Sequence, residues 1–134
     1  VGIYGDFYDG KVKSKLQSLD NVWLLGGFHY AELLMICETF KVGLLPYRQE
    51  IYHDGSPLKL YEYLRYCKPV LTSIDYELTD ERFIVNYRKK EVTDETLIQV
   101  IQLSGNKGIA ELLSDDDYFS KPLREIVVSL IGGG

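Results

Sequence analysis

Short runs of apolar residues alternate along the chain with longer segments in which apolar residues recur every three or four positions. The runs with the length of buried β-strands are residues 1–5, 22–25, 42–45, 70–73 and 82–87. The segments with the spacing of amphipathic helices are residues 11–19, 30–40, 56–66, 93–103 and 120–131. Alternating strands and helices are typical of a parallel sheet covered by helices, so the pattern predicts an α/β fold.

The same pattern predicts which side chains face the core. In segment 30–40 we expect a buried face made of Leu33, Leu34, Ile36, Cys37 and Phe40. In segment 93–103 we expect the inward side chains to be Leu97, Val100 and Ile101. The run 42–45 is almost wholly apolar, which predicts a strand covered on both faces. Residues 104–119 show no clear period.

Composition and charge narrow the class of protein. A chain of 134 residues that is 46% hydrophobic can form one domain, expected over residues 1–131, with a glycine tail at 132–134. The formal net charge of -5 argues against general nucleic-acid binding. Apolar runs are much shorter than the roughly 20 residues of a membrane-spanning helix. The 2 cysteines are too few for a disulfide framework, so we expect a cytoplasmic setting without a signal peptide.

The segment DGSPLKLYEYLRYCKPVLTS, residues 54–73, carries the clearest candidate chemistry. Ser56 and Pro57 are typical of a helix start. On such a helix Lys59 and Glu62 share one face, while the leucines at positions 60 and 64 occupy the core-facing side. The free N–H groups of the first turn, the helix dipole and the Lys59 ammonium favour a phosphate or diphosphate near the helix start.

Glu62 lies about one turn further along this helix. A carboxylate there can accept hydrogen bonds from a ribose diol, as acidic residues do in other nucleotide sites. The alternative is an ordinary solvated ion pair with Lys59, and spacing alone favours that alternative. No paired cysteine or histidine spacing suggests a metal site, and we expect none.

Several sequence blocks together resemble a known family. PLKLYEYL followed by KPVLTS, with NVWLLGGF and VGLLPY upstream, is similar to the nucleotide-sugar-binding C-terminal half of GT-B glycosyltransferases of the family 4 and family 1 group type. The resemblance covers about residues 1–80. It implies a three-layer Rossmann-like domain with a mostly parallel sheet. The family's first strand–helix unit has no counterpart, which implies a fragment truncated at its N-terminus.

The resemblance also implies roles for individual residues. Glu62 matches the residue that holds the donor ribose, and Asp54 matches the other acidic position, near the transferred sugar. The helix-start residues that match the diphosphate contact, together with Lys59, are Ser56, Pro57 and Leu58. Lys59 and Asp54 are thus the catalytic candidates.

Two further contacts are expected outside this helix. Gly27 and Phe28 match the strand end whose neighbourhood receives the nucleobase. Arg48 follows the strand end at Pro46, where it is well placed to meet a phosphate, with a solvated arginine as the equal alternative. One departure is Cys67, where the family commonly has Gly; if the helix ends in a left-handed residue, Cys carries a steric cost that Gly avoids.

The implied function is donor binding in a retaining glycosyltransferase, a hexosyltransferase that moves a sugar from a UDP-, GDP- or dTDP-sugar to a polysaccharide, lipid-linked glycan or similar acceptor. No cofactor is required, and the expected partner is the missing acceptor-binding half of the same parent chain. Sugar transfer by this chain alone is not expected. A nucleotide-sugar epimerase of GT-B architecture and a non-catalytic Rossmann-like interaction module remain alternatives. The resemblance leaves peripheral membrane association of the parent open.

Overall fold

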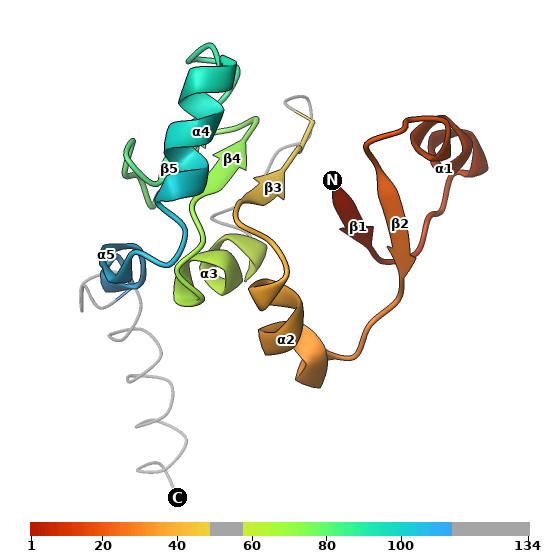
Figure 1. The fold of residues 1–134 in the computed structure, drawn as a ribbon, viewed down its shortest axis with the longest axis horizontal. Coiled ribbons are helices and arrows are strands. Elements are labelled where there is room, and N and C mark those ends of the chain that lie inside the picture. Colours follow the sequence, from red (N-terminus) through yellow and green to blue (C-terminus); the bar gives the residue numbers. More distant parts are fainter. Residues whose placement is uncertain (49–57, 114–134) are drawn as a thin grey trace, which may run out of the picture. The chain divides into compact units, whose positions relative to one another are not determined.

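The computed structural model describes residues 1–48 and 58–113, and within them the chain is an α/β protein with two small parallel sheets (Figure 1). One sheet pairs β1 (Gly2–Tyr4) with β2 (Trp23–Gly26). The other contains β3 (Gly43–Leu45), β4 (Val70–Thr72) and β5 (Ile84–Asn86), in that order. The chain divides into two compact units, Val1–Ile36 and Cys37–Gly134, each with one of these sheets.

The unit Val1–Ile36 is built from short elements. Helix α1 (Gly10–Gln17) begins after Asp9, whose carboxylate accepts a hydrogen bond from the Lys11 amide at 2.8 Å. The strand β2 ends at Gly26, whose φ of 77° lies in the left-handed region that glycine adopts without a steric cost. A 3-10 turn, η1 (Tyr30–Glu32), follows and leads into α2 (Leu33–Glu38), which crosses the boundary between the units.

The three-stranded sheet organises the second unit. Its strands are parallel and in register, so Leu45, Thr72 and Asn86 stand side by side at their carboxyl ends. Helices α3 (Leu58–Arg65) and α5 (Lys107–Glu111) cover one face. Helix α4 (Asp94–Gln102) covers the other face. Side chains alternate across a strand, so the central strand β4 is buried from both sides.

Two hydrophobic clusters fill the space between these layers. The cluster under α3 and α5 consists of Leu45, Leu60, Leu64, Val70, Tyr76, Leu78, Phe83 and Ile109. The cluster under α4 consists of Leu71, Val85 and Val100. Because Val70 and Leu71 are neighbours in one strand, they point to opposite faces and each belongs to a different cluster.

The predicted α/β alternation is confirmed over the described residues, with shorter elements than expected. The helix expected at 30–40 is split into η1 and α2, and the strand expected at 82–87 is confined to β5 because residues 80–83 form a turn closed by a hydrogen bond from the Phe83 amide to the Asp80 carbonyl. Helix α5 lies where the sequence shows no clear period. The helix expected at 120–131 lies outside the described residues.

Three burial predictions are wrong. Leu34 and Ile101 are exposed, because α2 and α4 bury only a narrow stripe, which includes Cys37 and Val100 respectively. The third concerns Leu44, which is exposed although the run 42–45 predicts a strand covered on both faces. Leu44 lies in β3, an edge strand of its sheet, whereas the cluster under α4 involves β4 and β5.

Candidate functional site

Helix α3 is stabilised by its apolar face and by a charge in its last turn. Leu60 and Leu64, one turn apart, are 0% exposed and anchor the helix to the sheet. Arg65 lies in the last turn, where its charge stabilises the negative end of the helix dipole. The apolar face is therefore fixed, and it turns Lys59 and Glu62 away from the leucine side of the helix.

Lys59 and Glu62 lie together as predicted, with the lysine half-exposed and the glutamate buried. The Lys59 Nζ atom is 3.8 Å from Glu62 Oε2, and the two side chains are 46% and 10% exposed. Glu62 is one of few buried charged or polar residues in the described part of the chain. Burying a carboxylate is costly unless partners compensate for lost water, and a pair at 3.8 Å compensates weakly.

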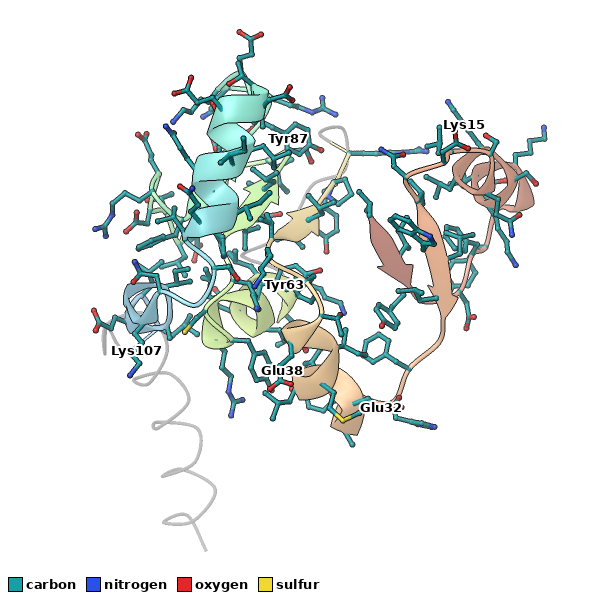
Figure 2. The ribbon with its side chains drawn as sticks, in the orientation of Figure 1. Lys15, Glu32, Glu38, Tyr63, Tyr87 and Lys107 are labelled. Atoms are coloured by element: carbon teal, nitrogen blue, oxygen red, sulfur yellow. The ribbon has the colours of Figure 1, made fainter. Side chains whose placement is uncertain are left out.

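The residue next to Glu62 packs tightly against β3. This residue is Tyr63 (Figure 2). Its ring meets Phe40 edge-to-face, with centroids 5.6 Å apart, and a Cβ atom at Gly43 would lie only 2.4 Å from Tyr63 Cδ2. Burial raises the pKa of Tyr63 to about 12, with smaller contributions from Cys37 and Glu62. Burial also raises the pKa of the Cys37 thiol, against the lowering effect of a nearby lysine. The surroundings of Glu62 are thus partly apolar and tightly packed.

The end of α3 is fixed by backbone hydrogen bonds. The Lys68 amide donates to the Tyr63 carbonyl at 2.9 Å, and the Cys67 amide donates to the Leu64 carbonyl at 3.0 Å. These two bonds define a Schellman motif, whose closing residue adopts a left-handed conformation. That residue is Cys67, with φ of 56°. Because the helix ends in a left-handed residue, Cys67 carries the steric cost that glycine would avoid.

The other residues expected around α3 are only partly described. Leu58 is the first residue of α3 and is exposed. Arg48 is exposed beyond the end of β3. Asp54, Ser56 and Pro57 lie outside the described residues.

The residues expected near the nucleobase belong to the other unit. Gly27 follows β2 and has open space where a Cβ atom would be placed. Phe28 packs edge-to-face on Tyr4, with ring centroids 5.7 Å apart. Gly27 and Phe28 thus lie in the unit Val1–Ile36, whereas Lys59 and Glu62 lie in Cys37–Gly134.

A polar group that the sequence prediction missed lies at the carboxyl ends of β4 and β5. Asp75, Asn86 and Lys89 are joined by hydrogen bonds and line a pocket of about 620 Å³. A usable signal was present, since Asp75 and Asn86 follow or end buried strands at the edge where parallel sheets bind ligands.

Among residues 1–48 and 58–113, no group of three or more His, Cys, Asp or Glu side chains is placed to hold a metal ion. In the same part of the chain, no helix has the length and apolar character to cross a membrane. No protein-family model, curated protein or solved structure matches the chain.

Proposed function

We propose that this chain is the donor-binding half of a glycosyltransferase of GT-B architecture, which holds a nucleotide diphosphate sugar. The observation that carries the proposal is the buried Glu62 carboxylate on α3, 3.8 Å from the half-exposed ammonium of Lys59. A carboxylate buried beside one ammonium group at 3.8 Å keeps acceptor capacity that the hydroxyl groups of a ligand can use.

Each residue has a distinct role in the proposed site. Glu62 accepts hydrogen bonds from the 2′- and 3′-hydroxyls of UDP or GDP, and from the 3′-hydroxyl alone of dTDP. Lys59 and the amide groups at the start of α3 face the diphosphate, and Asp54 is the candidate for a contact with the transferred sugar. When the nucleoside diphosphate departs, negative charge grows on its phosphate oxygens, and a fixed cation with fixed N–H donors stabilises that charge most in the transition state.

The sheet topology supports the proposed architecture. A doubly wound sheet has the strand order 3-2-1-4-5-6. Without strand 1, strands 2 and 3 would remain as a parallel pair and strands 4, 5 and 6 as a parallel set of three. The described strands form a parallel pair, β1-β2, and a parallel set, β3-β4-β5. The proposal therefore includes a preceding strand–helix unit and an acceptor-binding half in the parent protein.

The decisive experiment is a titration of the ¹⁵N-labelled chain with UDP, GDP and dTDP, followed by NMR. We expect weak binding, with shifts concentrated in α3. Glu62→Gln keeps the shape of the side chain but removes its charge, and it should weaken binding about tenfold, since a hydrogen bond to a charged group contributes about 1.5–3 kcal/mol. Glu38→Gln, on the exposed α2 position, is the matched control.

A second comparison tests the ribose assignment directly. The wild-type chain should bind a 2′,3′-dideoxy nucleoside diphosphate more weakly than the ordinary nucleotide. Glu62→Gln should bind the two nucleotides with equal affinity. Lys59→Ala should weaken binding of the diphosphate but not of the nucleoside, with Lys107→Ala as its control. Absence of shifts in α3 up to about 10 mM of all three nucleotides would contradict the proposal, since even a Kd of 1 mM corresponds to only about -4 kcal/mol.

A further inference from the structure

The pocket at the carboxyl ends of β4 and β5 is not part of the nucleotide site proposed on α3. Its volume of about 620 Å³ lies within the range of small-molecule sites. The apolar residues in its lining are Ile74, Leu78, Ile84 and Val85. Thr72 and Asn86, the last residues of two neighbouring parallel strands, both line it.

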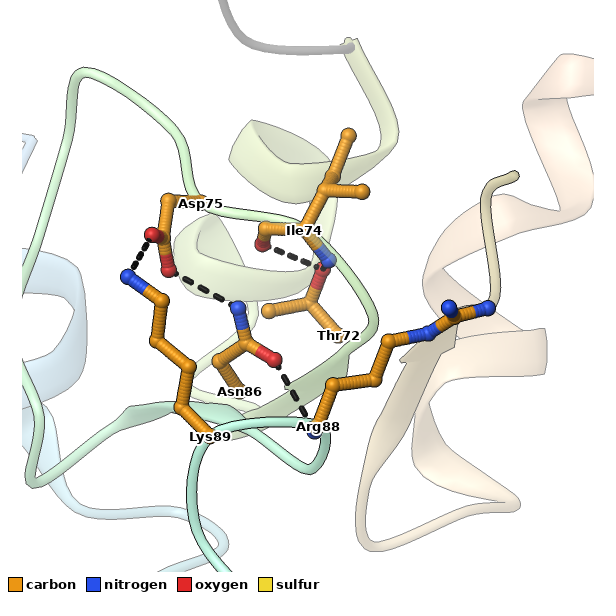
Figure 3. A network of polar contacts seen from close by, with 6 residues as sticks. All are labelled: Thr72, Ile74, Asp75, Asn86, Arg88 and Lys89. Atoms are coloured by element: carbon orange, nitrogen blue, oxygen red, sulfur yellow. Dashed lines mark hydrogen bonds and ion pairs between the residues drawn. The ribbon is translucent and has the colours of Figure 1, made fainter. Parts of the chain in front are cut away.

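The polar side of the pocket is held in place by its own hydrogen bonds (Figure 3). Asn86 Nδ2 donates to Asp75 Oδ1 at 2.8 Å, and Lys89 forms an ion pair with the other oxygen of Asp75. Asn86 Oδ1 accepts from the Arg88 amide at 3.0 Å, which fixes the orientation of the side-chain amide. Thr72 Oγ1 accepts from the Ile74 amide at 3.2 Å and lies 3.0 Å from the Tyr76 hydroxyl. A carboxylate, an amide and an ammonium group are therefore preorganised side by side.

The charges around the pocket nearly cancel. The carboxylates in its wall are Asp75, Asp80 and Glu81, and the ammonium groups are Lys89 and Lys90. Asp80 is also bound by Arg82, with Nη2 to Oδ2 at 2.7 Å. Within the described residues, the side chains of Glu81 and Lys90 take part in no hydrogen bond or ion pair. One carboxylate and one ammonium group without a side-chain partner are thus available to a ligand. The nearly balanced charges produce no net field that would attract a strongly charged ligand.

We propose that this pocket binds a neutral ligand rich in hydroxyl groups, of the size class of a monosaccharide. A hydroxyl group both donates and accepts, so neighbouring hydroxyls can satisfy the carboxylate of Glu81 and the ammonium of Lys90 together, while Asp75 and Asn86 retain unused acceptor or donor capacity. The apolar wall suits the C–H face of a sugar ring. This site goes beyond the proposed nucleotide function and does not depend on it.

The test is a ¹H–¹⁵N NMR titration of the chain with the methyl glycosides of glucose, galactose, mannose and N-acetylglucosamine. At least one should produce saturable shifts in the Asn86 side-chain amide and in the amides of residues 74–81. Lys90→Ala should weaken this binding about three- to tenfold, the loss of one hydrogen bond. Because Lys90 has no side-chain partner in the described structure, this variant should keep the fold. Lys13→Ala, on α1, is the matched control.

Two further variants, together with inorganic phosphate and glycine as ligands, distinguish a sugar site from the proposed nucleotide site and from a site for an anion or a zwitterion. Asn86→Ala should abolish the shifts, and its spectrum shows whether the fold is retained. Glu62→Gln should leave glycoside binding unchanged, so failure of the nucleotide proposal is distinguishable from failure of this one. Absence of shifts with all four glycosides at about 100 mM, well above the millimolar Kd of a weak site, overturns the inference. So does a response at these residues to inorganic phosphate or glycine but to no glycoside.

Discussion

The two compact units bury their sheets to very different degrees. In Val1–Ile36, Trp23 of β2 is 59% exposed, and α1 contains no buried residue. In the second unit all residues of β4 are buried, and Leu60 and Leu64 of α3 are 0% exposed. Both units are built from the same kinds of element, parallel strands and amphipathic helices. The difference in burial therefore lies in how many elements surround each strand.

The contrast shows what a parallel sheet needs to form a core. In a pair of strands, each strand is an edge, and a single helix cannot cover both faces. A set of three strands has a central member, and helices on both faces remove it from water. We therefore expect the stability of the chain to be concentrated in the unit that carries α3, and the following substitutions test this difference.

The largest effect is expected from Leu64→Ala in α3. It creates a cavity in a fully buried position and should lower the free energy of unfolding by about 2–5 kcal/mol. Leu25→Ala in the exposed part of β2 should change it by about 0.5 kcal/mol. Urea denaturation followed by circular dichroism measures both. Equal losses of stability would contradict the expected difference between the two units.

Gly43→Ala should be nearly as damaging. Its Cβ atom would lie 2.4 Å from the Tyr63 ring, so the ring or β3 must move, at a cost of about 2–3 kcal/mol. Gly27→Ala is the control in the other unit, since nothing lies within 4 Å of the added atom. The same denaturation measurement applies. A neutral Gly43→Ala would mean that Tyr63 has room to repack.

Alkaline pH should weaken the second unit through Tyr63. Its pKa is about 12 in the folded chain, above the value near 10 of an exposed tyrosine, so the neutral hydroxyl stabilises the fold below pH 10. Between about pH 10 and 12 the unfolded chain releases this proton first, and about 2 kcal/mol of stability is lost as the pH rises. Tyr63→Phe keeps the ring, so its urea midpoint should fall less steeply over this pH range. Parallel curves would contradict the assignment.

The smallest expected effect is a gain in stability. Cys67→Gly replaces a left-handed non-glycine residue, with φ of 56°, by the residue that adopts this conformation without a steric cost. We expect the free energy of unfolding to rise by about 1 kcal/mol. Cys67→Ala removes the thiol but keeps the strain, so it should give no comparable gain. A shift in the thermal midpoint of Cys67→Gly alone isolates the backbone effect.

Much of the fold and part of the candidate site could be predicted from the sequence. The Lys59–Glu62 pair was predictable because residues three apart share a helix face whatever surrounds the helix. The burial of Glu62 was not, since it depends on what packs beside that face. The Asp75–Asn86–Lys89 group was missed for the same reason, because its members come from two strand ends and the turn that follows.

The sequence by itself determined the alternation of strands and helices, the apolar face of α3 and the position at which that helix ends. Each follows from local periodicity or from residues next to one another in the chain. Only the tertiary structure decided that β3 is an edge strand with Leu44 exposed, that Glu62 is buried, and that a pocket lies at the carboxyl ends of β4 and β5. These features arise from contacts between segments distant in sequence, which no local pattern specifies.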